Sequence, residues 1–504
     1  SMVQRFKRVL IANRGEIAVR IILTAKKMGI ETWAIKTAKE PYAFYLSQAD
    51  RIIDFTERLD EIPEFLDVDA IIGTAKEHKI QAIHPGYGFL AESPYFAKRC
   101  EEENLVFIGP SSDAIYKMGN KTIAKQLART NNVPLLEGSH GNLKTADEAR
   151  KIANKIGYPL ILKAASGGGG RGMRIVEKEK DVEKMFKMAS SEAGKAFNDP
   201  SVFIEKYVRN PRHVEFQIFG DKKGNIIHLG ERECSVQRKH QKLIEEAPSP
   251  ALNPDLRKRM GEAAINIARS VNYYSAGTVE FLLDDESNFY FMEMNTRIQV
   301  EHPVTELVTG LDLVELQIRV AQDEELPIKQ DDVKIKGWAI EFRINAEDVQ
   351  AGFSPSLGTI EKISYPRSKN IRIDTGVIAG SAITPYFDSM IAKLIVYGDN
   401  REKAILYSRN ALKKLWIKGL KTTIPFCKAV LANRKFRKGE YDTSFLNSEM
   451  KIHYHVDPEE EMLAAFFATY DFVREIENEK KRAVDFEKGK NITPWLLKKR
   501  LRSL

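Results

Sequence analysis

The stretch Tyr158–Met173, YPLILKAASGGGGRGM, decides the fold. An apolar run ends at Lys163, and four consecutive glycines, Gly167 to Gly170, come shortly after it. Glycine runs cost backbone entropy, so they suit places where backbone N–H groups must approach phosphate closely. A flexible linker is the alternative. Linkers seldom lie between an apolar strand and a second strand, here GMRIVE, so the pattern favours a hairpin lid over a nucleotide.

The lid differs from a Walker loop, because the chain has no G-x-x-x-x-G-K-[ST] pattern. Lys163 falls near the interior of the expected strand, where an unpaired charge is costly. We therefore expect this lysine to have an anionic partner.

Outward from the lid, strand and helix patterns divide the chain. RVLIANRG, EIAVRIILTAKKMG and IETWAI alternate strand and helix, which predicts an open parallel α/β sheet near the N-terminus. The first turn reads N-R-G-E rather than G-x-G-x-x-G, which disfavours a dinucleotide-dependent oxidoreductase. The centre mixes helices with antiparallel strands, and β patterns dominate from about residue 334. We expect an α/β protein with an N-terminal α/β domain at 1–117, a central domain at 118–330 whose lid spans about 135–205, a β-rich domain at 334–448, and a charged helical extension at 449–504.

A hairpin in the central domain predicts a metal site. GTVEFLLDDESNFYFMEMN turns near Glu286–Ser287, which places Glu280 directly opposite Glu293. Opposed carboxylates repel unless a positive charge lies between them. Asn295 follows two residues later, on the same face. Three such oxygen donors suit Mg²⁺ bound together with nucleotide phosphates, whereas a solvated acidic hairpin is the alternative.

The next segment, TRIQVEHPVTE, suggests an anion site. Arg297, Gln299 and Glu301 alternate with apolar or neutral residues. An arginine beside a metal can hold a small anion by paired hydrogen bonds, and a nearby glutamate can act as a general base. Taken alone, the segment is also compatible with an exposed polar strand.

Composition narrows the class of protein. The chain has 504 residues and a net charge of +8, but its lysines are interleaved with acidic residues, which argues against a nucleic-acid partner. No apolar run spans a membrane, and the N-terminus lacks the apolar core of a signal peptide. Cys100, Cys234 and Cys427 are too far apart to suggest a disulfide framework or a metal cluster. We expect a cytoplasmic protein without membrane contact.

Several longer motifs carry a family resemblance. They are ANRGEIAVR, IHPGYGFLAE, FIGPS, MGNK, KAASGGGGRGMR, NPRHVEFQ, CSVQRKHQKLIEEAP, EMNTRIQVEHPVTE and RINAED. Together they resemble biotin carboxylase, the ATP-grasp component of biotin-dependent carboxylases, from about Lys7 to about Ser448. IHPGYGFLAE and RIQVEHPVTE are the most specific, because other ATP-grasp ligases share the glycine loop and the acidic hairpin. The segment KTAKEPYAFYLSQAD and the extension after about residue 450 depart from the family pattern. The resemblance implies an ATP-grasp fold with an N-terminal open parallel α/β domain, a mobile glycine-rich lid and a β-rich C-terminal domain.

The resemblance also implies site residues. The ATP-binding set is Lys121, Lys163, Gly169, Gly170, Glu205, Lys206, Tyr207, Val208, His213, Gln237, His240 and Leu282. The implied metal ligands are Glu280, Glu293 and Asn295. The implied bicarbonate pocket is Lys242, Arg297, Gln299, Val300 and Glu301. Arg343 matches the arginine that meets the biotin ureido group, and Lys242, Arg297, Glu301 and Arg343 form the implied catalytic set.

The implied reaction is the carboxylation of biotin by ATP and bicarbonate through carboxyphosphate, with Mg²⁺ or Mn²⁺ as cofactor. Glu301 would take the bicarbonate proton, Lys242 and Arg297 would hold the anion, and Arg343 would stabilise the biotin enolate. The implied partners are a biotin carboxyl carrier protein and a carboxyltransferase subunit of an acetyl-CoA, propionyl-CoA or pyruvate carboxylase, with a homodimer as the implied assembly. Another ATP-grasp ligase forming a carboxy- or carbamoyl-phosphate, and a non-catalytic nucleotide-binding regulator, remain alternatives.

The sequence also predicts that biotin arrives in trans. Lys187, in KMFKM, is the nearest match to a biotinylated lysine. Val182, Met185, Phe186 and Ala189 around it have a helical period, which predicts an amphipathic helix rather than an exposed β-turn.

Overall fold

The structure, a computed structural model, describes residues 4–139, 141–165 and 173–450. Gly169 and Gly170 of the expected lid and residues 451–504 of the expected extension lie outside the described residues.

A five-stranded parallel sheet forms the N-terminal part, with strand order β3-β2-β1-β4-β5. Its strands are β1 (Arg8–Ile11), β2 (Glu31–Lys36), β3 (Arg51–Asp54), β4 (Ala82–His84) and β5 (Val106–Phe107). The helices of this part are α1 (Gly15–Lys27), η1 (Phe44–Ser47), η2 (Glu64–Leu66), α2 (Val68–Glu77), α3 (Pro94–Glu102) and α4 (Ser112–Gly119). The open parallel sheet expected from the sequence is confirmed.

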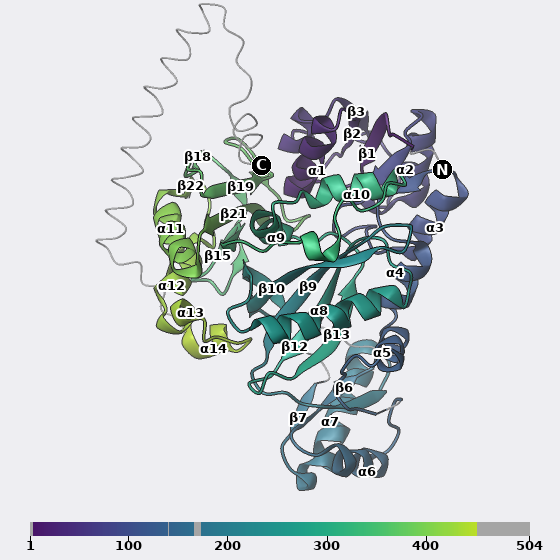
Figure 1. The fold of residues 1–504 in the computed structure, drawn as a ribbon, viewed down its shortest axis with the longest axis vertical. Helices are drawn as coiled ribbons and strands as arrows, with labels where there is room; N and C mark the ends of the chain where they lie inside the picture. The colour runs from purple at the N-terminus through teal and green to yellow at the C-terminus, as the bar shows by residue number, and fades with distance from the viewer. Residues whose placement is uncertain (1–3, 140, 166–172, 451–504) are drawn as a thin grey trace, which may run out of the picture.

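A small three-stranded sheet projects from the molecule at the lower end of Figure 1. It consists of β6 (Leu160–Ala164), β7 (Arg174–Val176) and β8 (Val202–Lys206), in the order β7-β6-β8. The helices of this region are α6 (Ala146–Ile156), η3 (Glu179–Asp181) and α7 (Val182–Phe197). The preceding helix, α5 (Lys121–Thr130), packs its buried alanines in an apolar cluster of the large sheet described next. β6 and β7 pair antiparallel on either side of the glycine run, as the hairpin prediction requires.

The largest element is an eight-stranded antiparallel sheet with the order β13-β12-β9-β10-β11-β14-β21-β19. Its strands are β9 (Arg212–Gly220), β10 (Ile226–Arg238), β11 (Gln241–Ala247), β12 (Ser275–Leu283), β13 (Phe289–Asn295), β14 (Trp338–Asn345), β19 (Ile371–Thr375) and β21 (Met390–Gly398). Because β11 pairs with β14, the sheet runs continuously past residue 330, where the sequence suggests a boundary. Associated helices are α8 (Pro254–Arg269), α9 (His302–Thr309), α10 (Leu313–Ala321) and η4 (Gln330–Asp332).

The two faces of this sheet differ because side chains alternate along a strand. Val214 and Phe216 of β9 and Val279 of β12 pack in one apolar cluster with residues of α8. Glu215 lies between Val214 and Phe216, and Glu280 follows Val279, so both glutamates point to the opposite face. Here buried acids and cations gather beside α9.

Short strands and helices complete the C-terminal part. The strands are β15 (Glu347–Asp348), β16 (Ser354–Pro355), β17 (Gly358–Thr359), β18 (Lys362–Ser364), β20 (Ala382–Ile383) and β22 (Trp416–Lys418). The helices are α11 (Arg401–Lys414), α12 (Ile424–Ala432), α13 (Arg434–Lys438) and α14 (Phe445–Glu449).

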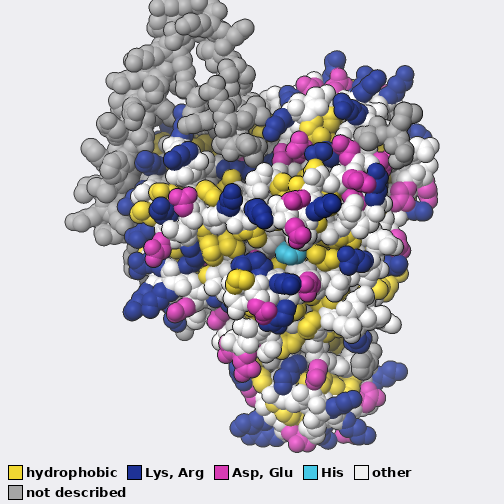
Figure 2. Space-filling model, in the orientation of Figure 1, with side chains coloured by type: hydrophobic (Ala, Val, Ile, Leu, Met, Phe, Trp, Pro, Cys, Tyr) yellow, Lys and Arg dark blue, Asp and Glu magenta, His cyan; other side chains and the backbone are white. Residues whose placement is uncertain are grey.

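Basic and acidic side chains are intermixed over the face shown in Figure 2, as the interleaved sequence suggests. Among the described residues, none of the helices has the length and apolarity needed to cross a lipid bilayer.

Candidate active site

A row of three glutamates crosses the polar face of the large sheet. Glu215 of β9 lies opposite Glu280 of β12, and Glu280 lies opposite Glu293 of β13. The predicted pairing of Glu280 with Glu293 is confirmed, although the register shifts by one residue between this pair and the turn, where Phe281 pairs with Phe291. Arg232 of β10 continues the row, and its Nε donates to Glu215 Oε1 at 2.6 Å. The row passes from the buried Arg232 and Glu215 to the exposed Glu293.

Lys242 of β11 connects this row to Glu301. Its Nζ lies 2.7 Å from Glu215 Oε2, 2.9 Å from Glu280 Oε1 and 2.8 Å from Glu301 Oε1. The Lys242 side chain is only 13% exposed. Burial alone would lower the pKa of Lys242, but the three carboxylates raise this pKa well above its ordinary value. Lys242 is therefore a fixed positive charge among acids that would otherwise repel one another.

The carboxylates around Lys242 divide into two kinds. Burial opposes ionisation of Glu280 and Glu301, but Lys242 and a second cation beside each acid, His213 or Arg343, hold both pKa values well below the usual range. Burial and the adjacent Glu301 raise the pKa of Glu215 to about 7. Desolvation and the opposed Glu280 raise the pKa of Glu293 to about 7, although its side chain reaches solvent. The face thus carries more carboxylates than its cations balance.

The expected metal ligands come together on this face. Asn295 Nδ2 donates to Glu280 Oε1 at 2.9 Å, and Glu293 lies opposite Glu280. Burial and the repulsion of Glu280 together raise the pKa of Glu293, and a divalent cation would relieve the repulsion. Carboxylate and amide oxygens are also the donors that Mg²⁺ prefers, so the residues present fit such an ion.

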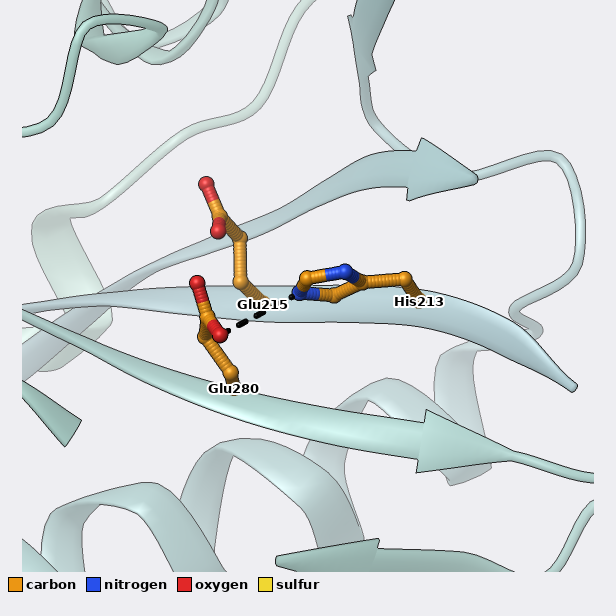
Figure 3. Close-up of side chains that lie close together, drawn as sticks. All are labelled: His213, Glu215 and Glu280. Atoms are coloured by element: carbon orange, nitrogen blue, oxygen red, sulfur yellow. Dashed lines mark ion pairs between the residues drawn. The ribbon is translucent and has the colours of Figure 1, made fainter. Parts of the chain in front are cut away.

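His213 extends this cluster along β9. Figure 3 shows its imidazole pointing toward Glu280, with Nε2 lying 3.5 Å from Glu280 Oε2. Glu215 rises from the same strand, and atoms of the three side chains lie close enough together to hold a metal ion. Gln237 Nε2 lies 3.2 Å from His213 Nδ1, and Leu282 pairs with His213 across the strands. Three members of the expected ATP set therefore border the carboxylate row.

The segment after β13 is not a strand. Residues 296–300 form an irregular loop, and Glu301 occupies the N-cap position of α9. The alternative interpretation of this segment as an exposed polar strand is wrong, because the segment is an irregular loop that leads into α9 at His302. Gln299 is buried, and among the described residues its Nε2 has no hydrogen-bond partner. An unused buried donor of this kind suits a small anion.

Arg297 lies at the outer side of this loop. Its Nη1 donates to Gln299 Oε1 at 2.7 Å and its Nε to Glu92 Oε2 at 3.2 Å. Arg297 therefore reaches the buried amide of Gln299, whereas the ion pairs of Glu301 run to Lys242 and Arg343.

Arg343 of β14 holds Glu301 from the side opposite Lys242. Its Nη2 lies 2.9 Å from Glu301 Oε2, and its Nε lies 2.6 Å from Glu245 Oε1. Cys234 Sγ lies 4.0 Å from Glu301 Oε1, and burial raises the pKa of this thiol well above its ordinary value. Glu301 thus lies between two cations, with a neutral thiol beside it.

A second cluster lies in the small sheet. Lys163 Nζ lies 2.9 Å from Glu205 Oε1, and Lys125 Nζ lies 3.2 Å from Glu205 Oε2. The anionic partner expected for Lys163 is confirmed. Burial opposes ionisation of Glu205, but the two lysines lower its pKa. Lys206 ends β8, and Tyr207 and Val208 follow it.

Two expected nucleotide contacts lie apart from these clusters. Lys121 is exposed at the first position of α5, and His240 is exposed in the turn between β10 and β11. In the described part of the chain, neither forms an ion pair with the carboxylate row.

Sequence reasoning missed several residues of this face. Glu215 alternates with His213 in RHVEFQ, so period-two spacing places both on one face. Glu92 and Glu245 lie within the motifs IHPGYGFLAE and CSVQRKHQKLIEEAP, but the sequence gives them no role, and Lys125 lies outside every quoted motif.

Comparisons with known proteins identify the family. Three family models match: the biotin carboxylase N-terminal domain over residues 5–115, the carbamoyl-phosphate synthase L chain ATP-binding domain over 120–329, and the biotin carboxylase C-terminal domain over 341–448. Biotin carboxylase 1 of Bacillus subtilis is 49% identical over 88% of this chain and 98% of its own length. The 2-oxoglutarate carboxylase small subunit of Hydrogenobacter thermophilus is 47% identical over 90% of this chain and 94% of its own.

Solved structures agree with this assignment. The biotin carboxylase domain dimer of Hydrogenobacter thermophilus 2-oxoglutarate carboxylase, solved with MgADP, ADP and bicarbonate, has a TM-score of 0.82 and 47% identity. That alignment covers 89% of this chain and 98% of the other. The biotin carboxylase–β,γ-ATP complex from Campylobacter jejuni has a TM-score of 0.82 and 46% identity, covering 88% and 99% of the two chains. With its ATP-grasp fold, this chain belongs to the biotin carboxylase family.

Proposed function

We propose that this chain carboxylates biotin with ATP and bicarbonate, as the first half-reaction of a biotin-dependent carboxylase. The observation that carries the proposal is the network in which Lys242 and Arg343 both hold Glu301. It places a cation for an anionic substrate, an ionised carboxylate and a second cation within one connected group. The network borders the carboxylate row, and the residues of this row suit the Mg²⁺ or Mn²⁺ that accompanies ATP.

The nucleotide would be held by the lid residues together with the lysine cluster of the small sheet. We propose that Lys163, Glu205 and the segment Lys206–Val208 contact ATP, with His213, Gln237 and Leu282 on the side of the row. Lys121, Gly169, Gly170 and His240 remain predictions for the same role. Mg²⁺ or Mn²⁺ bound by Glu280, Glu293 and Asn295 would offset negative charge on the nucleotide phosphates.

Lys242 and Glu301 account for bicarbonate activation. We propose that Lys242, Arg297, Gln299 and the Val300 segment bind bicarbonate, with the unused Nε2 of Gln299 among the donors. Glu301 would accept the bicarbonate proton. Since the ammonium that lowers the pKa of Glu301 would then pair with the bound anion, bicarbonate binding would raise the proton affinity of Glu301 when transfer is required.

The remaining proposed steps are phosphoryl transfer to bicarbonate, breakdown of carboxyphosphate and carboxylation of biotin. A bicarbonate oxygen attacks the γ-phosphoryl group, and ADP leaves. The carboxyphosphate divides into CO₂ and phosphate, the phosphate takes the ureido N–H proton of biotin, and the nitrogen adds to CO₂. Arg343, held by Glu245 and Glu301, would stabilise negative charge on the ureido oxygen.

Biotin would come from a separate carrier protein, and a carboxyltransferase subunit would use the product. Lys187 lies on the exposed side of α7 and pairs with Glu183 at 3.1 Å, so it lacks the turn geometry of a carrier lysine. We further propose a homodimer, supported by the dimeric relative. A cytoplasmic location suits the three buried free thiols, Cys100, Cys234 and Cys427.

The test is the ATPase activity of the purified chain with each component omitted in turn. We expect hydrolysis that requires bicarbonate and Mg²⁺ and increases with free biotin. Stimulation by ammonia instead of biotin would indicate the carbamoyl-phosphate type of ligase. ATP binding without turnover would indicate a regulator.

A further inference from the structure

A buried lysine beside Arg343 holds the backbone of the bicarbonate loop. Lys393 of β21 lies directly opposite Arg343 of β14 in the strand register. Its side chain is 0% exposed, and its Nζ donates to the Val300 carbonyl oxygen at 2.6 Å. The two neighbouring cations therefore hold consecutive residues, because Lys393 binds the backbone at Val300 while Arg343 binds the side chain of Glu301.

The charge of Lys393 is balanced from the N-terminal domain. Its Nζ lies 3.1 Å from Glu16 Oε1, in the first turn of α1, and the Glu16 side chain is almost as deeply buried. The hydroxyl of Tyr87 donates to the same Oε1 at 2.5 Å. Two hydrogen bonds and an ion pair thus connect Tyr87 through Glu16 and Lys393 to the Val300 carbonyl oxygen.

The approach of α1 to the sheet is tight at this point. Gly376 follows β19, and a Cβ added there would lie 2.6 Å from the Glu16 backbone nitrogen. Only a residue without a side chain allows this contact, so the position of Glu16 is set by backbone packing.

We propose that Lys393 is a positioning residue that fixes the loop at residues 296–301 for bicarbonate, with Glu16 as its counter-charge. The inference rests on the proposed function and goes beyond it, because neither residue belongs to the proposed binding or catalytic set. The hydrogen bond restrains the peptide between Val300 and Glu301. Gln299 and Glu301, on either side of Val300, are the proposed donor and base, so a shift of this peptide would displace both. Displacements of about 1 Å in reacting groups can cost about a hundredfold in rate.

The experiment separates positioning from loss of folding. Lys393→Met alone leaves Glu16 buried and unpaired, which can unfold the chain. The double variant Glu16→Gln/Lys393→Met removes both charges of this pair. Its new amide oxygen at position 16 can still accept the Tyr87 hydrogen bond, but the donor to Val300 is absent. The matched control is the double variant Glu246→Gln/Arg401→Met, which removes both charges of a largely buried ion pair at 2.8 Å, away from the loop.

Bicarbonate-dependent ATPase is measured for the parent, the double variant and the control. We expect the KM for bicarbonate to rise about tenfold or more in the double variant, with the KM for ATP unchanged, because only the bicarbonate loop is released. Glu246→Gln/Arg401→Met should leave both KM values at the parental level. An unchanged bicarbonate KM in the double variant, or an equal rise in both KM values, would overturn the positioning role. A parent without bicarbonate-dependent activity would instead refute the proposed function.

Discussion

The two sheets that carry the proposed site hold their lysines in different ways. In the three-stranded sheet, Lys163 shares the single carboxylate Glu205 with Lys125, and its side chain remains 32% exposed. In the eight-stranded sheet, Lys242 contacts three carboxylates and is 13% exposed. The small sheet is otherwise stabilised by an apolar cluster that includes Leu160 and Phe186. A change in the small sheet should therefore stay local, whereas one in the large sheet should spread through the whole network.

The largest effect is expected for Lys242→Met. This change leaves Glu215, Glu280 and Glu301 without their shared cation, and uncompensated buried charge is strongly destabilising. We expect bicarbonate-dependent ATPase to fall by about 10³-fold or more and the melting temperature to fall with it. Steady-state kinetics and thermal unfolding check this. Activity near the parental level would mean that Lys242 is not the centre of the site.

A smaller effect is expected for Glu293→Gln, at the exposed end of the row. The substitution removes one proposed metal ligand and also the repulsion with Glu280 that raises the pKa of Glu293. Stability should be unchanged or slightly higher, whereas the Mg²⁺ concentration for half-maximal activity should rise about tenfold. Overlapping Mg²⁺ titrations of parent and variant would exclude the row as the metal site.

Lys163→Met tests the small sheet. Glu205 keeps Lys125 as a partner, so the folded state should lose little stability. We expect the KM for ATP to rise about tenfold, because one charge-assisted hydrogen bond to phosphate is lost. The KM for bicarbonate should be unchanged. Lys125→Met is the control, since it removes the other lysine of the pair. Equal effects of the two variants on ATP would argue against a specific phosphate contact by Lys163.

The smallest effect is expected for Lys187→Ala on α7. The ion pair with Glu183 is exposed on both sides and screened by solvent, so thermal unfolding of the variant should match that of the parent. A streptavidin blot after co-expression with a biotin ligase should show no biotin on the parent chain. A biotinylated peptide containing Lys187 would contradict the proposal that biotin arrives in trans.

Local sequence patterns predicted one contact in each of the two sheets. Hairpin pairing placed Glu280 opposite Glu293, and the cost of an unpaired charge near a strand interior predicted the anionic partner of Lys163. The contacts of Lys242 could not be derived from its own segment, because strand order in the large sheet depends on long-range pairing. The alternating pattern after Asn295 misleads for a similar reason, since α9 takes Glu301 as its N-cap and turns it toward Lys242 and Arg343. Motif resemblance supplied these residues, and the fold explains why they meet.

We propose that the network of Lys242, Glu301 and Arg343 connects bicarbonate activation to biotin carboxylation. The most direct test is transfer of radiolabel from bicarbonate to free biotin by the parent chain and by Arg343→Met. We predict ATP-dependent labelling of biotin by the parent and about 10²-fold less by the variant, with ATP binding retained. Hydrolysis of ATP by the parent without labelled biotin, or equal labelling by both proteins, would contradict the account.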